Sequence, residues 1–287
     1  MASLRDIRRR IASVRKTQQI TRAMRMVAAA KLRRSQDAIE SARPYARYMR
    51  ATLEAVAASL GNAAEHPLLV PRERVRRLEL LVVTSDRGLC GAFNSNVLKY
   101  AEALRCEREA QVEEIGYTLL GRKGLEFVRR RRRVVSEGYV ALGNVRYGHA
   151  EAVAEPLMSR YVAGELDEVV LVYSEFVSAL TQRPTEVRLL PFTSEGAAAQ
   201  EFGPPIHFEP RADRLLALLA PKAIEVEIYR ALLESQAGEH AARMTAMESA
   251  TRNTEEMIDL LTLTYNRARQ AAITKELVEI VSGAEAL

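Results

Sequence analysis

The sequence predicts an α/β protein in which two long terminal helices form an antiparallel coiled coil, with an α/β domain inserted between them. The first observation is a helical pattern from about residue 211 almost to the C-terminus, with Pro221 near its start and Gly238 inside it. The second is a similar pattern over residues 3–60, which contain Pro44 and no glycine. The third is the alternation of short apolar runs with helical segments between these two, which is typical of a parallel sheet with crossover helices.

The N-terminal helix is predicted by composition and by the spacing of apolar residues. Helix-favouring residues dominate residues 3–60, and Pro44 predicts at most a kink within them. Steps of three and four residues, the spacing of a coiled-coil seam, separate the first apolar positions: Leu4, Ile7, Ile11 and Val14. The polar pair Thr17 and Gln18 then interrupts this seam. We expect the seam to resume in a different phase at three residues: Ile20, Met24 and Val27.

The middle of the chain, residues 61–205, is predicted to form a compact domain. A polar linker with Pro67 and Pro71 precedes an apolar run at residues 78–84, which predicts a buried strand. Three further strands are expected at residues 117–120, 169–176 and 186–191. Helices are expected at residues 95–114, 123–132 and 150–163. This alternation predicts a largely parallel, Rossmann-like sheet inserted between the two long helices.

The C-terminal helix, within residues 206–287, would be on the order of 100 Å long at about 1.5 Å per residue. No small domain can bury such a helix within itself, so it needs a second helix or a sleeve of protein beside it. An intermittent apolar stripe predicts which side is covered: Ile224, Ile228, Met257, Leu260, Leu261, Ile273, Leu277 and Ile280. The N-terminal helix, residues 1–60, is the expected antiparallel partner.

Composition is that of an ordinary soluble protein, with 287 residues, 48% hydrophobic and 28% charged. The uncharged apolar runs are far too short to cross a bilayer, and arginines interrupt any signal-peptide core near the N-terminus. We therefore expect no direct membrane insertion. Cys90 and Cys106 resemble neither a disulfide framework nor a metal set, which favours a reducing cytoplasm.

Positive charge is concentrated at the N-terminus. Residues 1–50 contain 14 Lys or Arg and 3 Asp or Glu, so this segment carries +11; because the whole chain carries +5, the remainder carries −6. Three interpretations compete: a binder of nucleic acid or anionic lipid, a rod that faces an acidic protein surface, and a solvated helix face. The cationic residues are spread around the helix, so a helix that lies on a membrane is the weakest of these interpretations.

Two glycine-containing turns resemble ligand sites but are better explained structurally. Gly116 and Gly121 have the spacing of a phosphate-binding loop, yet the hydroxyl residue that such a loop needs for magnesium is missing. Asp86, Gly88 and Gly91 follow a predicted strand, where open sheets often bind ligands. A tight strand-to-helix turn explains these glycines equally well, although an α/β enzyme that uses this turn stays an alternative.

The remaining candidates for chemistry are also weak. The four histidines are scattered, with none at metal-ligand spacing, so no metal site or cofactor is expected. Ser85 and Ser95 have no neighbouring histidine and no nucleophile-elbow motif. The arginine run at residues 129–133 would suit phosphate contacts, but a solvated helix end is the favoured interpretation. The sequence therefore offers no convincing active site.

Three separated motifs resemble the gamma subunits of F-type, proton-translocating ATP synthases of the bacterial type. The C-terminal stretch ITKELVEIVSGAEA matches the family's signature at Ile273, Thr274, Glu276, Glu279, Gly283 and Ala284. The N-terminal stretch IRRRIASVRKTQQITRAMRMVAAAKLRRSQ matches the family's first helix, and TSDRGLCGAFN matches the first strand and turn of its central domain. The resemblance extends from end to end of the chain.

The resemblance implies a mechanical role without a catalytic site in this chain. In the family, the coiled coil passes through a ring of alternating alpha and beta subunits, and the α/β domain rests with the epsilon subunit on the membrane ring of c subunits. Proton flow turns the c-ring and this shaft, which couples rotation to ATP synthesis and hydrolysis. The implied location is peripheral, at the cytoplasmic face of the bacterial inner membrane. The alternative function is a basic helical nucleic-acid-binding protein.

The resemblance also implies specific contact residues. Arg269, Gln270 and Thr274 match positions that contact the alpha/beta ring, and Ile280 matches the apolar collar at the top of this ring. Met24 and Arg243 match positions at which the two helices meet and coupling is sensitive. The foot that meets the c-ring and the epsilon subunit is implied at two positions, Ile206 and Glu209.

Overall fold

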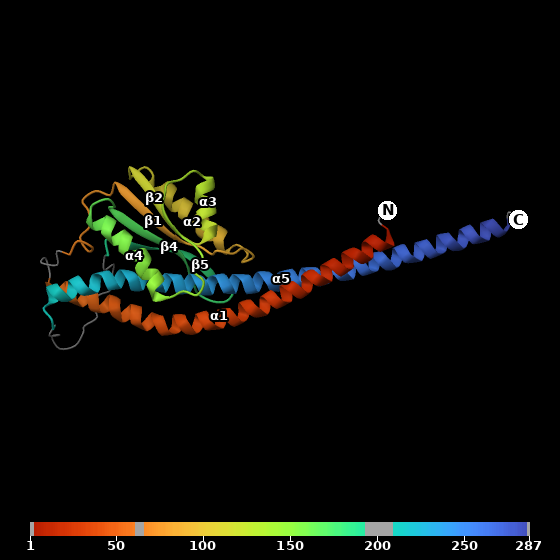
Figure 1. The fold of residues 1–287 in the computed structure, drawn as a ribbon, viewed down its shortest axis with the longest axis horizontal. Coiled ribbons are helices and arrows are strands. Elements are labelled where there is room, and N and C mark those ends of the chain that lie inside the picture. The colour runs from red at the N-terminus through yellow and green to blue at the C-terminus, as the bar shows by residue number, and fades with distance from the viewer. Residues whose placement is uncertain (1–2, 61–65, 193–208, 286–287) are drawn as a thin grey trace. The chain divides into compact units, whose positions relative to one another are not determined.

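The computed structural model describes residues 3–60, 66–192 and 209–285 (Figure 1). The long terminal helices are α1 (Leu4–Leu60) and α5 (Ala212–Glu285). Between them lie five strands, β1 (Arg77–Val83), β2 (Glu114–Leu120), β3 (Val135–Tyr139), β4 (Glu168–Phe176) and β5 (Gln182–Leu190). Three shorter helices complete the fold: α2 (Phe93–Arg108), α3 (Arg122–Arg130) and α4 (Tyr147–Val162). The predicted fold class, two long helices around an inserted α/β domain, is confirmed.

The sheet has the order β3-β2-β1-β4-β5, in which the first four strands are parallel and β5 is antiparallel to β4. Alternating residues of β1 enter two separate cores, because successive strand side chains point to opposite faces. On one face, Leu80 and Val82 pack against α2 and α3. On the other face, Leu81 and Val83 pack against α4 and against residues of α1 and α5 (Figure 1). The sheet is therefore covered on both faces.

Two details of the α/β domain differ from the prediction. The helix expected at residues 95–114 ends at Arg108, because the N–H groups of Glu113 and Glu114 donate to the carbonyl oxygen of Arg76 and draw the chain into β2. Strand β3 was not predicted. Its sequence, VSEGY, is short and polar, and the strand lies at the edge of the sheet, where one side makes no ladder hydrogen bonds.

Contacts divide the chain into two compact units, and each is described by itself. One unit consists of residues 30–242 and contains the α/β domain with the adjoining parts of α1 and α5. The other consists of residues 1–29 and 243–287, the remaining parts of the two long helices. We call the second unit the helical tip.

Within the helical tip, α1 and α5 are antiparallel. Arg8 donates to the Tyr265 hydroxyl at 2.7 Å, and further along α1 the Thr21 and Thr251 hydroxyls are 2.9 Å apart. As the residue number rises on α1, that of the partner on α5 falls. The Thr21 hydroxyl also lies 3.0 Å from the Gln18 carbonyl oxygen, which satisfies this buried polar group.

The predicted phase change in the N-terminal seam is wrong. Ile20 and Val27 are 59% and 56% exposed and Met24 is half-buried, so the expected second phase does not face α5. The first phase continues without a break through buried or half-buried residues: Ile7, Ile11, Val14, Gln18, Thr21 and Ala28. A polar residue can occupy the seam here because its hydroxyl finds a partner on the other helix, a possibility that a purely apolar pattern misses.

The stripe predicted on α5 is correct only in part. Ile224 and Ile228 are fully buried in the larger unit, and Leu261 is half-buried in the helical tip. Met257 and Leu260 are exposed instead, because the side of α5 that faces α1 contains a different set: Met247, Thr251, Thr254, Ile258, Leu261 and Tyr265. The last part of the predicted stripe, Ile273, Leu277 and Ile280, is exposed in this structure.

Candidate functional site

The end of α5 is a surface built from a single helix. Residues 265–278, YNRARQAAITKELV, contain no glycine or proline and many helix-favouring residues, so α5 continues through them without interruption. The guanidinium of Arg8 lies over the Tyr265 ring at 5.6 Å from its centroid and donates to its hydroxyl. Since Arg8 is close to the start of α1 at Leu4, most of α5 after Tyr265 has no α1 residue opposite it.

Three of the predicted contact residues lie together on this surface. Arg269, Gln270 and Thr274 are exposed, and Thr274 follows Gln270 by four residues, which places the two side by side on the helix. A guanidinium beside an amide offers several N–H donors and one carbonyl acceptor, so the group suits carboxylate and carbonyl partners. The structure thus gathers these residues at one place and leaves their polar groups available.

An exposed apolar stripe continues beyond them. Ile273, Leu277 and Ile280 are 45%, 57% and 68% exposed, and Val278 and Val281 are exposed beside them. Steps of three and four residues keep such side chains on one side of a helix. A contiguous apolar surface of this kind marks a site that another protein covers.

Met24 and Arg243 are both half-buried in the helical tip, but they do not lie directly opposite each other. The pairs Thr21 with Thr251 and Arg25 with Glu248 place Met24 opposite the stretch of α5 between these two partners. Arg243 precedes Glu248 by five residues, a rise of about 7.5 Å along the helix. The structure therefore puts the two residues on neighbouring turns of the helical tip.

The predicted foot is only partly described. Ile206 lies outside the described residues. Glu209 is exposed and is joined through Pro210 and Arg211 to the first residue of α5, Ala212. An exposed carboxylate at this position is able to meet a partner, and the described structure shows no ion pair for it.

The turn after β1 is held by its own polar groups. The Asp86 carboxylate accepts from the Arg122 N–H at 3.0 Å, and the Asn94 side chain accepts from the Ser85 N–H at 2.9 Å. A Cβ on Gly121 would lie 2.2 Å from the Thr84 carbonyl oxygen, and the backbone φ of Gly121 is 96°. Only glycine fits this close approach between β1 and the start of α3. Gly121, the second glycine of the first candidate ligand turn, therefore has a structural explanation.

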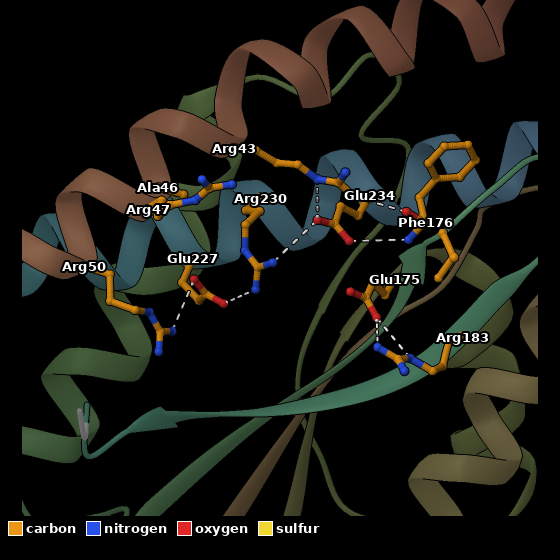
Figure 2. Close-up of a pocket in the computed structure, with 11 residues that line it drawn as sticks. Arg43, Ala46, Arg47, Arg50, Glu175, Phe176, Arg183, Glu227, Arg230 and Glu234 are labelled. Atoms are coloured by element: carbon orange, nitrogen blue, oxygen red, sulfur yellow. Dashed lines mark hydrogen bonds and ion pairs between the residues drawn. The ribbon is translucent and has the colours of Figure 1, made fainter. Parts of the chain in front are cut away.

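Sequence reasoning missed a network of charged residues in the larger unit. Figure 2 shows Glu227 and Glu234 of α5 linked to Arg50 and Arg43 of α1, and Arg230 of α5 linked to both carboxylates. Glu234, whose side chain is 2% exposed, lies 3.5 Å from both Arg43 Nε and Arg230 Nη1 and accepts from the Phe176 N–H at 3.3 Å. Glu227 pairs with Arg50 at 3.5 Å and also with Arg230. In the sequence, the spacing of Glu227, Arg230 and Glu234 at i, i+3 and i+7 indicates that these charged residues lie on one side of α5 and could have predicted their ion pairs.

The network borders an open hollow of about 670 Å³ between α1, α5 and the start of the β4–β5 connection (Figure 2). Burial raises the pKa of Glu234 above its ordinary value, although the nearby Arg230 and Arg43 favour the carboxylate form. Each carboxylate that lines the hollow, including Glu175 through Arg183, is already paired with an arginine. These ion pairs therefore hold α1 against α5 within the larger unit, which is a structural role.

The part of the chain that the structure describes contains neither a metal-ligand cluster nor a membrane-spanning helix. Among residues 3–60, 66–192 and 209–285, no three His, Cys, Asp or Glu side chains are grouped so that they could hold a metal ion. Within the same ranges, no helix has both the length and the apolar character that a membrane span requires.

Comparison with known proteins gives a consistent result. The family model described as ATP synthase matches residues 3–287. The chain is 50% identical to proteins named ATP synthase gamma chain from Anaeromyxobacter sp. (strain K) and Desulforamulus reducens, over 290 residues and all of both chains. It is 49% identical to the protein of that name from Geobacter metallireducens, covering 100% of this chain and 99% of the other.

Two solved structures have a similar fold. The central stalk and c-ring structure of the Tetrahymena thermophila mitochondrial ATP synthase contains a chain with 25% identity and a TM-score of 0.60, which covers 80% of this chain and 99% of that one. A rotor chain of the Euglena gracilis mitochondrial ATP synthase has a TM-score of 0.68 at 19% identity, covering 94% and 98%. The second likeness shows the fold alone.

Proposed function

This chain belongs to the ATP synthase gamma chain family, and from this premise we propose that it is the central rotor shaft of an F-type ATP synthase. As the shaft, it couples proton-driven rotation of the c-ring to conformational changes in the alpha/beta hexamer. The observation that carries the proposal is the match along the whole chain to gamma chains at 50% identity. The exposed apolar stripe at the end of α5 supports it, because exposed apolar patches of this kind are typical of surfaces that contact another protein.

The proposed mechanism uses the asymmetry of the helical tip. Two antiparallel helices present different side chains in each direction, and beyond Tyr265 α5 continues with little of α1 beside it. As such a shaft turns, each beta subunit meets a different surface. A surface that binds one conformation of a beta subunit more tightly shifts the population toward that conformation and changes its nucleotide affinity.

Specific contacts follow from the exposed end of α5. We assign Arg269, Gln270 and Thr274 to hydrogen bonds with loops of the alpha/beta ring, and Ile280 to the apolar collar at the top of the ring. Met24 and Arg243 occupy the part of the shaft where small changes of shape affect coupling. Ile206 and Glu209 are assigned to the foot that meets the c-ring and the epsilon subunit.

The chain is a subunit of an enzyme complex, and we propose that it has no catalytic site of its own. Nucleotide chemistry belongs to the alpha and beta subunits in this proposal. We divide the shaft into residues 1–60 and 206–287, which form the coiled coil, and residues 61–205, which form the α/β domain. The proposed location is the cytoplasmic face of the bacterial inner membrane, where the chain is held peripherally by its partners.

The positive charge of α1 has a role in this proposal. Exposed cationic residues, among them Arg5, Arg9 and Arg10, face solvent in the free chain. We propose that they provide long-range attraction to acidic loops of the surrounding ring. Such attraction is screened by salt and has no fixed partner, so it does not hold the shaft at one angle. Neutralising several of these arginines should weaken coupling at low salt more than at high salt.

The experiment that tests the function is reconstitution. The purified chain is mixed with alpha and beta subunits of the same organism, and assembly and ATP hydrolysis are measured with and without it. We expect a complex with one copy of this chain and hydrolysis that depends strongly on its presence. If the chain fails to associate at low salt and binds DNA instead, the nucleic-acid alternative replaces this proposal.

A further inference from the structure

Helix α3 and the three residues that follow it have a high density of positive charge. Residues 122–133 contain seven Lys or Arg and one Glu, and residues 129–133 are five consecutive arginines, all exposed. In the described structure, none of these five forms an ion pair. Other arginines of the same domain do pair with carboxylates: Arg74, Arg76, Arg77, Arg105, Arg108, Arg160, Arg183 and Arg188. We call residues 122–133 the α3 basic segment.

The geometry of these five arginines prevents one compact anion from contacting all of them. Helix α3 ends at Arg130, and the guanidinium of Arg131 lies over the Phe127 ring at 3.6 Å from its centroid. Arg132 then has a φ of 54°, which turns the chain toward β3. Consecutive side chains at a helix end point about 100° apart, so no single small ion can contact all five guanidinium groups. An extended anionic surface can attract all of them.

The chemistry around the segment favours a lipid surface over a nucleic acid. Single-stranded nucleic acid needs exposed aromatic faces for base stacking, and Phe127, the nearby aromatic residue, is half-buried and covered by Arg131. Clusters of four to eight basic residues on an amphipathic helix are typical of binding to anionic lipid headgroups.

We propose that the α3 basic segment binds the headgroup surface of an anionic phospholipid membrane, by electrostatic attraction and without insertion. This inference rests on the proposed function in one respect, that the subunit works beside a membrane. A diffuse attraction is compatible with a turning shaft, because it holds the domain near the surface without a fixed contact.

The test measures binding of the full chain to vesicles that contain phosphatidylglycerol and phosphatidylcholine, at low salt. Each basic side chain near such a surface contributes roughly a fivefold factor in binding. The variant Arg129→Gln/Arg130→Gln/Arg132→Gln should therefore lose on the order of a hundredfold in partition coefficient. A matched control, Lys31→Gln/Arg33→Gln/Arg34→Gln, removes the same charge from exposed positions of α1 and should bind nearly as the original chain does.

Three results would overturn the inference. The first is unchanged binding of the α3 variant, and the second is an equal loss in the α1 control, which would show only a response to net charge. The third is a loss in Arg129→Lys/Arg130→Lys/Arg132→Lys, because lysine keeps the charge that the attraction needs. Thermal unfolding checks that each variant is folded. Assembly with alpha and beta subunits is measured in the same preparations, so a failure of the rotor proposal is distinguished from a failure of lipid binding.

Discussion

Glu234 shows how a buried charge can be both costly and necessary. Its carboxylate lies between Arg43 and Arg230 and is almost completely removed from solvent. Removing one partner of such a group leaves uncompensated charge, which typically costs about 3–5 kcal/mol. We expect Glu234→Ala to lower the free energy of unfolding by about 3 kcal/mol, measured by urea denaturation.

The control for this prediction is an exposed pair of the same hollow. Arg183 pairs with Glu175 at 2.6 Å, but the Arg183 side chain is 67% exposed. Such pairs contribute about 0–1 kcal/mol, so Glu175→Ala should have a small effect. Equal losses from the two substitutions would show that the buried carboxylate of Glu234 contributes no more stability than an exposed ion pair does.

The pKa of Glu234 gives a second prediction at this scale. Burial raises this pKa in the folded chain above its value in the unfolded chain, so the folded state binds the proton more tightly. The stability that Glu234 contributes is therefore greatest below the unfolded pKa and declines as the pH rises through the folded pKa. The free energy of unfolding of the original chain, minus that of Glu234→Gln, should fall as the pH is raised from about 4 to 7.

Arg230 and Arg43 oppose this trend, because they favour the ionised carboxylate, but the direction of the pKa shift shows that burial outweighs them. The comparison with Glu234→Gln removes the titration of all other groups that the two chains share. A difference that rises with pH would mean that the arginines, not burial, determine the charge of Glu234.

At the scale of elements, the clearest test of the structure is which residues of α1 face α5 in the coiled coil. Ile20 and Val27 are exposed on α1, whereas Ile7 is 5% exposed and faces α5. In the free chain, Ile20→Ala and Val27→Ala should each change the free energy of unfolding by less than about 0.5 kcal/mol. Ile7→Ala, the matched control, should cost about 2–5 kcal/mol, because it removes buried methyl groups. Large losses of stability in Ile20→Ala and Val27→Ala would instead support the phase change that the sequence predicts, in which these residues face α5.

Most elements of the fold could be predicted from sequence, because their apolar periods are strong. The buried runs of β1 and β4 and the breaker-free stretches of α1 and α5 each identify one type of element. Strand β3 could not be identified in this way, since an edge strand with polar residues has no apolar period. The continuation of the seam through Thr21 was missed, because the partner of its hydroxyl, Thr251, lies 230 positions away in the sequence.

Only part of the candidate site could be predicted from sequence. Arg269, Gln270 and Thr274 came from resemblance, and the structure adds that they are exposed together on one stretch of α5. The ion-pair network around Glu234 was missed because it joins α1, α5 and the backbone of Phe176, which are far apart in sequence. Local spacing can suggest such a network, but only tertiary packing brings its members together.

At the scale of the whole molecule, the end of α5 should matter for assembly and not for folding. Arg269 and Gln270 are exposed in the free chain, so Arg269→Ala/Gln270→Ala should leave its thermal unfolding unchanged. In the complex that we propose with alpha and beta subunits, the same change should remove the proposed hydrogen bonds to the ring, and hydrogen bonds that involve a charged group are each worth about 1.5–3 kcal/mol. We expect ATP hydrolysis by the complex to fall by about tenfold or more.

Arg214→Ala, at another exposed arginine of α5, is the matched control and should leave hydrolysis unchanged. Full activity of the double variant would remove these residues from the ring contact, while an equal loss in the control would trace the effect to the general loss of charge along α5.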